Sequence, residues 1–232
     1  MLQDPTATAL HASVTALRAS AVADAIRAHR LVAVLRRVTP RERLLGLVEE
    51  LADAGVRIFE VTLDGEGAAE DLAVVRRAVP ADGPDRCFVG AGTVRTLDQL
   101  RSAGRAGADL AVSPVLDPAI VGAAIASGLP FVPGAYTPTE ADLAWRSGAT
   151  FVKLFPGSSL GPAHVRELRG PLPEIETIVS GGVDATNAAA FLAAGAVAVG
   201  IGTALVAASP AERRAIVAAV RERAPESMLA RP

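Results

Sequence analysis

One sequence unit recurs along this chain: the end of a helix, then a glycine, then a short apolar strand. The unit returns at intervals of roughly 20–25 residues, the spacing of strand–helix repeats in α/β barrels. Clear copies are ELADAGVRIFEV (50–61), RAGADLAVSP (105–114), AIASGLPFVPG (124–134), WRSGATFVKLF (145–155) and LAAGAVAVGIG (192–202). A chain built in this way is restricted to folds in which parallel strands alternate with helices.

The strands of these units are short and almost wholly apolar. Such runs are typical of parallel strands that are buried on both faces. Between them lie amphipathic helices such as 41–55, which places Leu44, Leu47, Val48 and Leu51 on one face and ends at a glycine. The predicted strands are 31–36, 56–63, 86–92, 109–114, 130–134, 150–155, 174–180 and 196–202.

Eight such units without a linker predict a single (β/α)8 TIM barrel over residues 1–232. Residues 1–30 then form an N-terminal helical extension, and we expect 225–232 to be a frayed tail. The alternative is an open doubly wound sheet, whose fingerprint is GxGxxG after the first strand. Here the first strand runs into RRVTP, which contains no glycine, so the barrel is favoured.

Composition excludes several classes of protein. Half of the residues are hydrophobic and the formal charge is −2, which does not suggest a nucleic-acid or membrane partner. The single cysteine excludes an intramolecular disulfide framework, and no His, Asp and Glu set has metal spacing, so we expect no cofactor and no metal. The N-terminus lacks the compact apolar stretch of a signal peptide, which predicts a cytoplasmic protein.

The chain contains one lysine, Lys153, and it lies inside the apolar run TFVKLFP. As a structural residue it would form half of a buried ion pair, which is usually no more stable than apolar packing. As a functional residue its amine could attack a carbonyl carbon and form a Schiff base. The sequence leaves both interpretations open.

Charged side chains are predicted at the C-terminal ends of the strands, where TIM barrels hold their active sites. Alternation places Val56, Ile58 and Glu60 on one face of the second strand. The same alternation predicts that Arg36 and Lys153 point towards the mouth of the barrel. Glu60 would be the proton shuttle that a Schiff-base reaction needs, or a purely structural carboxylate.

Glycine turns follow the seventh and eighth predicted strands, at VSGGV (179–183) and GIGTAL (200–205). Loops at these two positions commonly bind phosphate in TIM barrels, through backbone N–H groups that a Cβ would obstruct. The alternative is that both are ordinary tight connections in a chain rich in alanine and glycine.

Taken in order, these motifs resemble the 2-keto-3-deoxy-6-phosphogluconate (KDPG) and 4-hydroxy-2-oxoglutarate (KHG) aldolases, together with their 6-phosphogalactonate relatives. The resemblance extends from about residue 31 to residue 206. Its carriers are FEVTL (59–63), VGAGTV (89–94), AVSPVL (111–116), FVPGAYTPTE (131–140), FVKLFPGSSLGP (151–162), SGGV (180–183) and GIGTAL (200–205).

The resemblance implies a metal-free class I aldolase that cleaves a 2-keto-3-deoxy sugar acid into pyruvate and an aldehyde. Lys153 would form the Schiff base and Glu60 would relay protons. The family is commonly homotrimeric, so a homotrimer is expected. Further implied site residues are Thr93, Pro114 and Phe155 around the pyruvyl group, and Ser180, Gly181, Gly182, Gly202 and Thr203 in the phosphate turns.

The chain departs from the family pattern directly after EVTL. The 6-phosphogluconate enzymes typically carry an arginine there that holds the substrate carboxylate, whereas this chain has Asp64. Either Arg36 and Thr93 hold the carboxylate, or the substrate differs. Two other hypotheses remain: a phosphate-binding barrel isomerase or epimerase, and a non-catalytic trimer that binds a metabolite.

Overall fold

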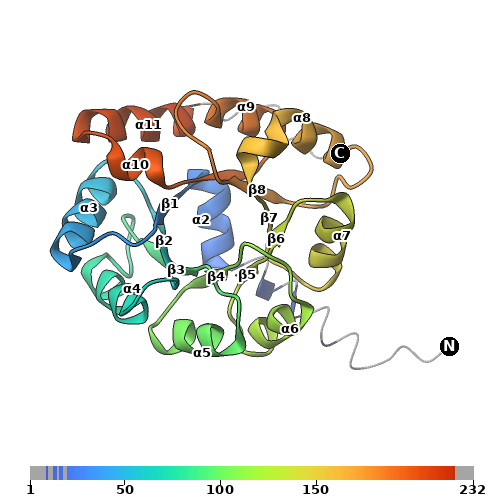
Figure 1. The fold of residues 1–232 in the computed structure, drawn as a ribbon, viewed down its shortest axis with the longest axis horizontal. Helices are drawn as coiled ribbons and strands as arrows, with labels where there is room; N and C mark the ends of the chain where they lie inside the picture. Colours follow the sequence, from blue (N-terminus) through green and yellow to red (C-terminus); the bar gives the residue numbers. More distant parts are fainter. Residues whose placement is uncertain (1–8, 10–12, 15, 18–19, 223–232) are drawn as a thin grey trace.

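The computed structural model describes residues 9, 13–14, 16–17 and 20–222, and shows a closed ring of parallel strands surrounded by helices (Figure 1). The hydrogen-bonded order is β5-β4-β3-β2-β1-β9-β8-β7-β6, and neighbouring strands in this order are parallel. The strands are β1 (Leu31–Leu35), β2 (Ile58–Thr62), β3 (Phe88–Gly92), β4 (Leu110–Val112), β5 (Phe131–Val132), β6 (Gly134–Ala135), β7 (Val152–Leu154), β8 (Thr177–Ser180) and β9 (Ala198–Ile201).

The predicted fifth strand, 130–134, is wrong as a single element, because the structure divides it into β5 and β6. Pro133 separates the two pieces and has no N–H for a sheet hydrogen bond. Its carbonyl accepts from the Lys153 backbone N–H at 2.8 Å. β5 pairs with β4 and β6 with β7, so the segment that contains both strands closes the sheet into a barrel. The prediction of a TIM-barrel-like fold is confirmed.

Helices follow the strands and form the outer wall of the barrel (Figure 1). Local sequence explains where several begin: Asp117 caps one N-terminus, and Thr137 with Glu140 forms a capping box at another, each followed by proline. The helices are α2 (Ala21–His29), α3 (Arg41–Asp53), α4 (Ala68–Ala78), α5 (Leu97–Arg105), α6 (Pro118–Ala126), α7 (Pro138–Arg146), α8 (Gly157–Arg169), α9 (Ala188–Ala193), α10 (Thr203–Ala207) and α11 (Pro210–Glu222).

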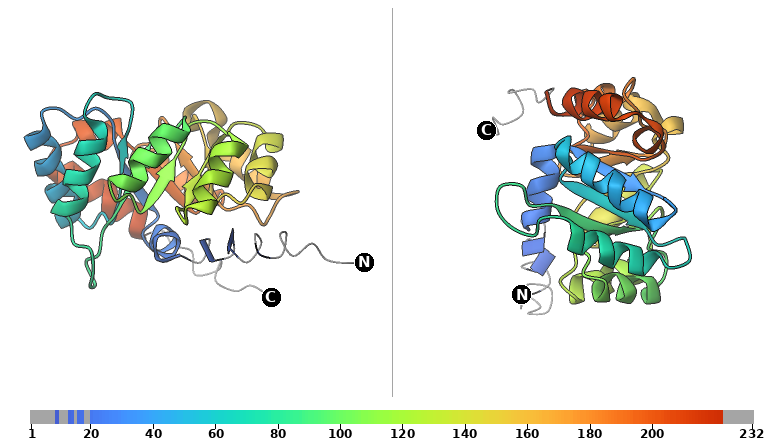
Figure 2. Two further views of the ribbon diagram at one scale, coloured as in Figure 1. Left: turned by 90° about the horizontal axis from the view of Figure 1, so that it is seen from below. Right: turned by 90° about the vertical axis from the view of Figure 1, so that its left-hand side faces the viewer.

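Helix α2 lies across the end of the barrel opposite the strand C-termini, as Figure 2 shows. Its apolar face joins a buried cluster inside the ring, which excludes water from the lower half of the barrel. The expected N-terminal helical extension therefore includes a covering helix, while the predicted tail 225–232 lies outside the described residues. The cluster comprises Val22, Ala23, Ile26, Val32, Ile58, Phe88, Leu110, Val112, Val132, Phe151, Ile178 and Ala198.

Val56 is the one residue of its predicted strand face that does not join this interior. It precedes β2, which begins at Ile58, and packs instead with the outer layer between strands and helices. The inward face of β2 therefore begins at Ile58 and continues through Glu60 and Thr62. Within the described part of the chain, no helix is long and apolar enough to cross a membrane.

Replacing Ile26 by alanine should destabilise the barrel by about 2–4 kcal/mol, since it opens a cavity beneath the interior cluster. Ile26 is 1% exposed. Urea unfolding at 25 °C would measure the loss. Ala28→Ser, at an exposed position of the same helix, is the matched control and should change stability by less than about 0.5 kcal/mol. Equal unfolding midpoints for the two variants would contradict the covering role of α2.

Candidate active site

Lys153 and Glu60 meet inside the barrel near the C-terminal ends of the strands. Lys153 lies in the middle of β7 and Glu60 in the middle of β2, and these strands face one another across the ring. The distance from Lys153 Nζ to Glu60 Oε1 is 3.7 Å, and the two residues are 4% and 3% exposed. Strand alternation alone therefore predicted correctly that both side chains point inwards.

The geometry of this pair differs from that of a purely structural ion pair. Two charges removed from water are stabilised only by close contact and further hydrogen bonds. Here the separation is long, and Glu60 Oε1 has no hydrogen-bond partner among the described residues. The Lys153 amine also lies 5.3 Å from the centroid of the Phe155 ring. Both groups thus remain free to interact with a molecule that enters the site.

Gly92, at the end of β3, makes room for the Glu60 carboxylate. A Cβ atom at Gly92 would overlap Glu60 Oε1 and its neighbouring carbons, so any other residue would force the Glu60 side chain to shift. Sequence reasoning used the GAGT segment for Thr93 and did not identify this glycine as part of the site. The signal was the glycine-rich end of an otherwise apolar strand, which often marks a close approach.

A cavity of about 400 Å³ opens above Lys153 towards solvent. Every residue predicted for the phosphate turns lines this cavity, as do Arg36 and Phe155. Its full lining is Val34, Arg36, Lys153, Phe155, Ser180, Gly181, Gly182, Val183, Asp184, Gly200, Gly202, Thr203 and Ala204. The fold therefore brings the reactive amine and the glycine turns after β8 and β9 into one chamber.

The turn after β8 needs glycine for its conformation. Gly181 and Gly182 have φ angles of 86° and 74°, in the left-handed region that side chains rarely adopt. A Cβ at Gly181 would lie 2.8 Å from the Phe155 ring. The Ser158 backbone N–H donates to the Gly181 carbonyl at 2.9 Å, and the Asn187 amide donates to the Gly182 carbonyl at 2.9 Å. These bonds hold the turn in place at the cavity wall.

Thr93 and Pro114 were predicted to contact substrate, but neither lines this cavity. Thr93 Oγ1 instead accepts a hydrogen bond at 3.3 Å from Arg36 Nη2. The Pro114 carbonyl packs against Gly134, whose register partner across β6 and β7 is Lys153. Both residues therefore lie beside residues of the cavity wall: Thr93 contacts Arg36, and Pro114 packs on the strand that pairs with β7.

Sequence reasoning missed Asp184, which lines the cavity directly after the glycine turn. The Thr186 hydroxyl and backbone N–H donate to Asp184 Oδ1 at 2.6 and 2.8 Å, and hold the pKa of that carboxyl below its usual range. Its position after SGGV was the available signal. Among the described residues, no group of three His, Cys, Asp or Glu side chains could hold a metal ion.

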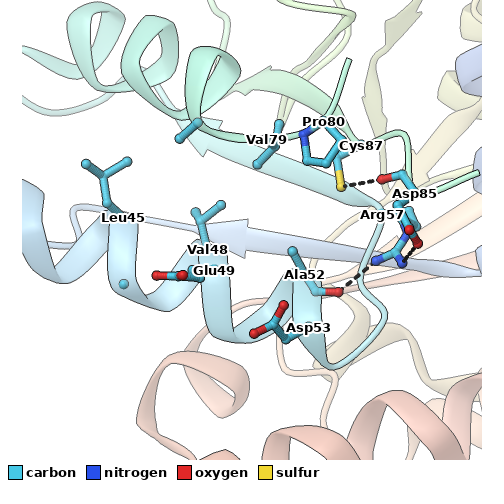
Figure 3. Close-up of a pocket in the computed structure, with 12 residues that line it drawn as sticks. Leu45, Val48, Glu49, Ala52, Asp53, Arg57, Val79, Pro80, Asp85 and Cys87 are labelled. Atoms are coloured by element: carbon cyan, nitrogen blue, oxygen red, sulfur yellow. Dashed lines mark hydrogen bonds and ion pairs between the residues drawn. The ribbon is translucent and has the colours of Figure 1, made fainter. Parts of the chain in front are cut away.

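A larger cavity, of about 660 Å³, lies on the outer wall of the barrel beside α3 (Figure 3). Arg57 there donates to Asp85 at 2.6 Å, and Cys87 lies buried beneath them. Burial raises the pKa of the Cys87 thiol, which makes it a poor nucleophile. This cavity does not include Lys153 or the glycine turns, so it is not the candidate active site.

Comparisons with known proteins find one family along most of the chain. Residues 22–220 match the family model described as "Aldolase: KDPG and KHG aldolase". A probable 2-dehydro-3-deoxy-6-phosphogalactonate aldolase of Rhizobium meliloti (strain 1021) is 35% identical over 176 residues, which cover 75% of this chain and 81% of the relative.

Solved structures show the same likeness. The native KDPGal structure superposes with a TM-score of 0.73 at 31% identity, covering 83% of this chain and 92% of the other. A KDPG aldolase from Legionella pneumophila, with pyruvate captured as a covalent carbinolamine intermediate, has a TM-score of 0.72 at 25% identity and covers 85% and 95%. The family model spans most of the chain, and this chain belongs to the KDPG and KHG aldolase family and is an aldolase of that type.

Proposed function

We propose that this aldolase cleaves a 2-keto-3-deoxy sugar acid into pyruvate and an aldehyde through a Schiff base on Lys153. The observation that carries the proposal is the buried amine of the sole lysine, which lines an open cavity and lies 3.7 Å from a Glu60 carboxylate oxygen that has no hydrogen-bond partner among the described residues. A neutral amine in such a site is a nucleophile for carbonyl carbon. The carbinolamine captured in the Legionella relative is consistent with this chemistry.

The reaction assigns Lys153 and Glu60 distinct roles. The unprotonated Lys153 amine adds to the C2 carbonyl of the substrate, and the carbinolamine loses water as Glu60 supplies a proton to the departing hydroxyl. The C4 hydroxyl of the resulting iminium then loses its proton to Glu60. The C3–C4 bond breaks, its electron pair moves to the iminium to form an enamine, and the aldehyde is released. Protonation of the enamine at C3 and hydrolysis of the iminium then release pyruvate and regenerate the amine.

The substrate carboxylate is assigned to Arg36, which lines the cavity and is supported by Thr93. A guanidinium presents N–H groups that match a carboxylate in geometry and charge. Phe155 forms a wall beside the Lys153 amine, and Pro114 supports the neighbouring strand.

The distal end of the substrate is assigned to the glycine turns, and we infer a 6-phosphorylated substrate of the phosphogalactonate or phosphogluconate type. Ser180 and Thr203 add hydroxyl groups to the turns formed by Gly181, Gly182 and Gly202. Backbone N–H groups at such turns are suited to phosphate oxygens. The phosphogalactonate activity named for the Rhizobium relative supports this class.

We also propose that the chain acts as a cytoplasmic homotrimer, as the resemblance implies. The single chain leaves several large apolar side chains exposed, which an assembly could cover. These are Leu97, Val115, Tyr136 and Leu143, each between 40% and 48% exposed.

Incubation with pyruvate and borohydride should attach a reduced pyruvyl group to the peptide that contains Lys153. Peptide mapping separates this adduct from one at the N-terminal amine, because the chain has no other lysine. Lys153→Ala should abolish both the adduct and turnover, and its circular dichroism spectrum should remain that of the wild type. A Lys153→Arg variant that kept measurable turnover would instead support charge neutralisation, as in an isomerase.

Glu60→Gln should lower kcat by about 10²–10⁴-fold, the range for a lost general acid or base, with a smaller change in KM. The amide keeps the shape of the side chain but cannot accept and return protons. Glu176→Gln is the control, since Glu176 pairs with Arg27 at the opposite end of the barrel. Wild-type kcat in Glu60→Gln would exclude the assigned role.

Removal of the distal phosphate from the substrate should lower kcat/KM by about 10²-fold, as expected for two or more charged hydrogen bonds. Thr203→Val should lower kcat/KM for the phosphorylated substrate and leave the unphosphorylated one unchanged. Steady-state assays of pyruvate release measure both. Equal kcat/KM for the phosphorylated and unphosphorylated substrates would show that the glycine turns do not bind the distal phosphate.

A further inference from the structure

Asp64 lies at the centre of a charged cluster at the mouth of the barrel, in the loop that follows β2. Arg36 Nη1 donates to its Oδ2 at 2.5 Å. Arg37 Nη2 lies 3.4 Å from the same oxygen and donates to the Asp64 backbone carbonyl at 3.0 Å. On its other side, Arg36 Nη2 donates to Thr93 Oγ1. One carboxylate thus connects the loops after β1 and β2, and Arg36 continues the connection to the end of β3.

The cluster keeps a net positive charge, because two guanidinium groups surround one carboxylate. Burial raises the pKa of the Asp64 carboxyl, but the nearby Thr62 hydroxyl and the charges of Arg36 and Arg37 outweigh that effect and hold the pKa below its usual range. Asp64 therefore stays ionised at neutral pH. An anion that approaches Arg36 meets one positive charge in excess.

The contribution of this cluster to folding stability is small. The Arg36 side chain is 49% exposed and the Arg37 side chain 65% exposed, whereas Asp64 is 16% exposed. Ion pairs of such exposed arginines are screened by water and contribute little to stability. The cluster instead fixes the orientation of the Arg36 guanidinium, because two of its nitrogen atoms donate hydrogen bonds.

The backbone is strained at Arg37 and Thr93, which lie at the two ends of the chain of contacts through Asp64 and Arg36. Arg37 has a φ of 48° and Thr93 a φ of 58°, and a β-branched residue such as threonine rarely adopts a positive φ. Strained residues persist where the surrounding contacts over-determine the conformation, and they concentrate at functional sites. Here both strained residues belong to the loops that Asp64 and Arg36 connect.

We propose that Asp64 is a positioning residue for carboxylate recognition: it holds the Arg36 guanidinium against Thr93 so that further N–H groups of Arg36 face the carboxylate of a 2-keto acid on Lys153. Arg36 and Lys153 line the same cavity, which Asp64 does not. Asp64 therefore acts through Arg36 and does not touch the substrate. This inference rests on the proposed Schiff-base function.

The proposal is tested by the concentration of pyruvate that gives half-maximal borohydride trapping on Lys153. Asp64→Ala should raise this concentration roughly tenfold, as expected when a charged hydrogen bond is weakened. Asp64→Asn keeps the shape without the charge and should give a smaller increase. Hydroxyacetone, a ketone without a carboxylate, should be trapped equally well by wild type and both variants.

A double-mutant cycle separates positioning from a direct effect. In the Arg36→Ala background, Asp64→Ala should change the half-saturating pyruvate concentration by less than about twofold, because the group through which it acts is absent. Asp71→Asn breaks a 2.6 Å ion pair with Arg41 between α3 and α4 and is the matched control. It should behave as the wild type.

Three results would overturn the proposal: an unchanged pyruvate dependence in Asp64→Ala, an equal effect on hydroxyacetone, or the same effect with and without Arg36. Thermal unfolding of each variant identifies a loss that arises from misfolding, and Asp64→Asn supplies the comparison if Asp64→Ala is unstable. Absence of any Lys153 adduct in the wild type would overturn the Schiff-base function itself, and this inference with it.

Discussion

Closure of the parallel sheet is the constraint on which the site depends. A strand interrupted at Pro133 pairs on one side with β4 and on the other with β7, so the sheet has no free edge and its strand ends form a ring. Parallel strands direct all their C-termini to the same end, and closure places strands that are distant in sequence opposite one another. Only for this reason can an amine on β7 lie 3.7 Å from a carboxylate on β2.

The two ends of the ring then serve different purposes. At the lower end, helix α2 and the apolar cluster exclude water, which is the packing that stabilises the barrel. At the end where the strand C-termini lie, glycines stand in place of bulky residues, and polar groups occupy the space beside them. Gly92 admits the Glu60 carboxylate, and the glycines after β8 form a cavity wall that carries no side chains. The site is therefore a local interruption of close packing, maintained by the rigid ring beneath it.

Charge at the mouth is arranged by loops and not by strands. Arg36, Asp64 and Thr93 come from the ends of three neighbouring strands, and their hydrogen bonds join loops whose backbones are strained. Asp64 stands where the family resemblance predicts an arginine; Arg36 and Arg37 both pair with it, and of these two Arg36 also lines the cavity. In the function proposed above, the substrate carboxylate is therefore held from the loop after β1, while the barrel and Lys153 keep their places.

The sequence by itself determined the barrel and the inward direction of Glu60 and Lys153, because glycine-ended helices and strand alternation are local properties of the chain. It also determined the two glycine turns, since only their composition was needed. Tertiary contacts were needed to show that Val56 packs outside the ring, that Gly92 makes room for Glu60, and that Asp64 pairs with Arg36. Each of these depends on atoms from segments about 20 residues or more apart, whose approach follows from the closure of the ring and not from any local pattern.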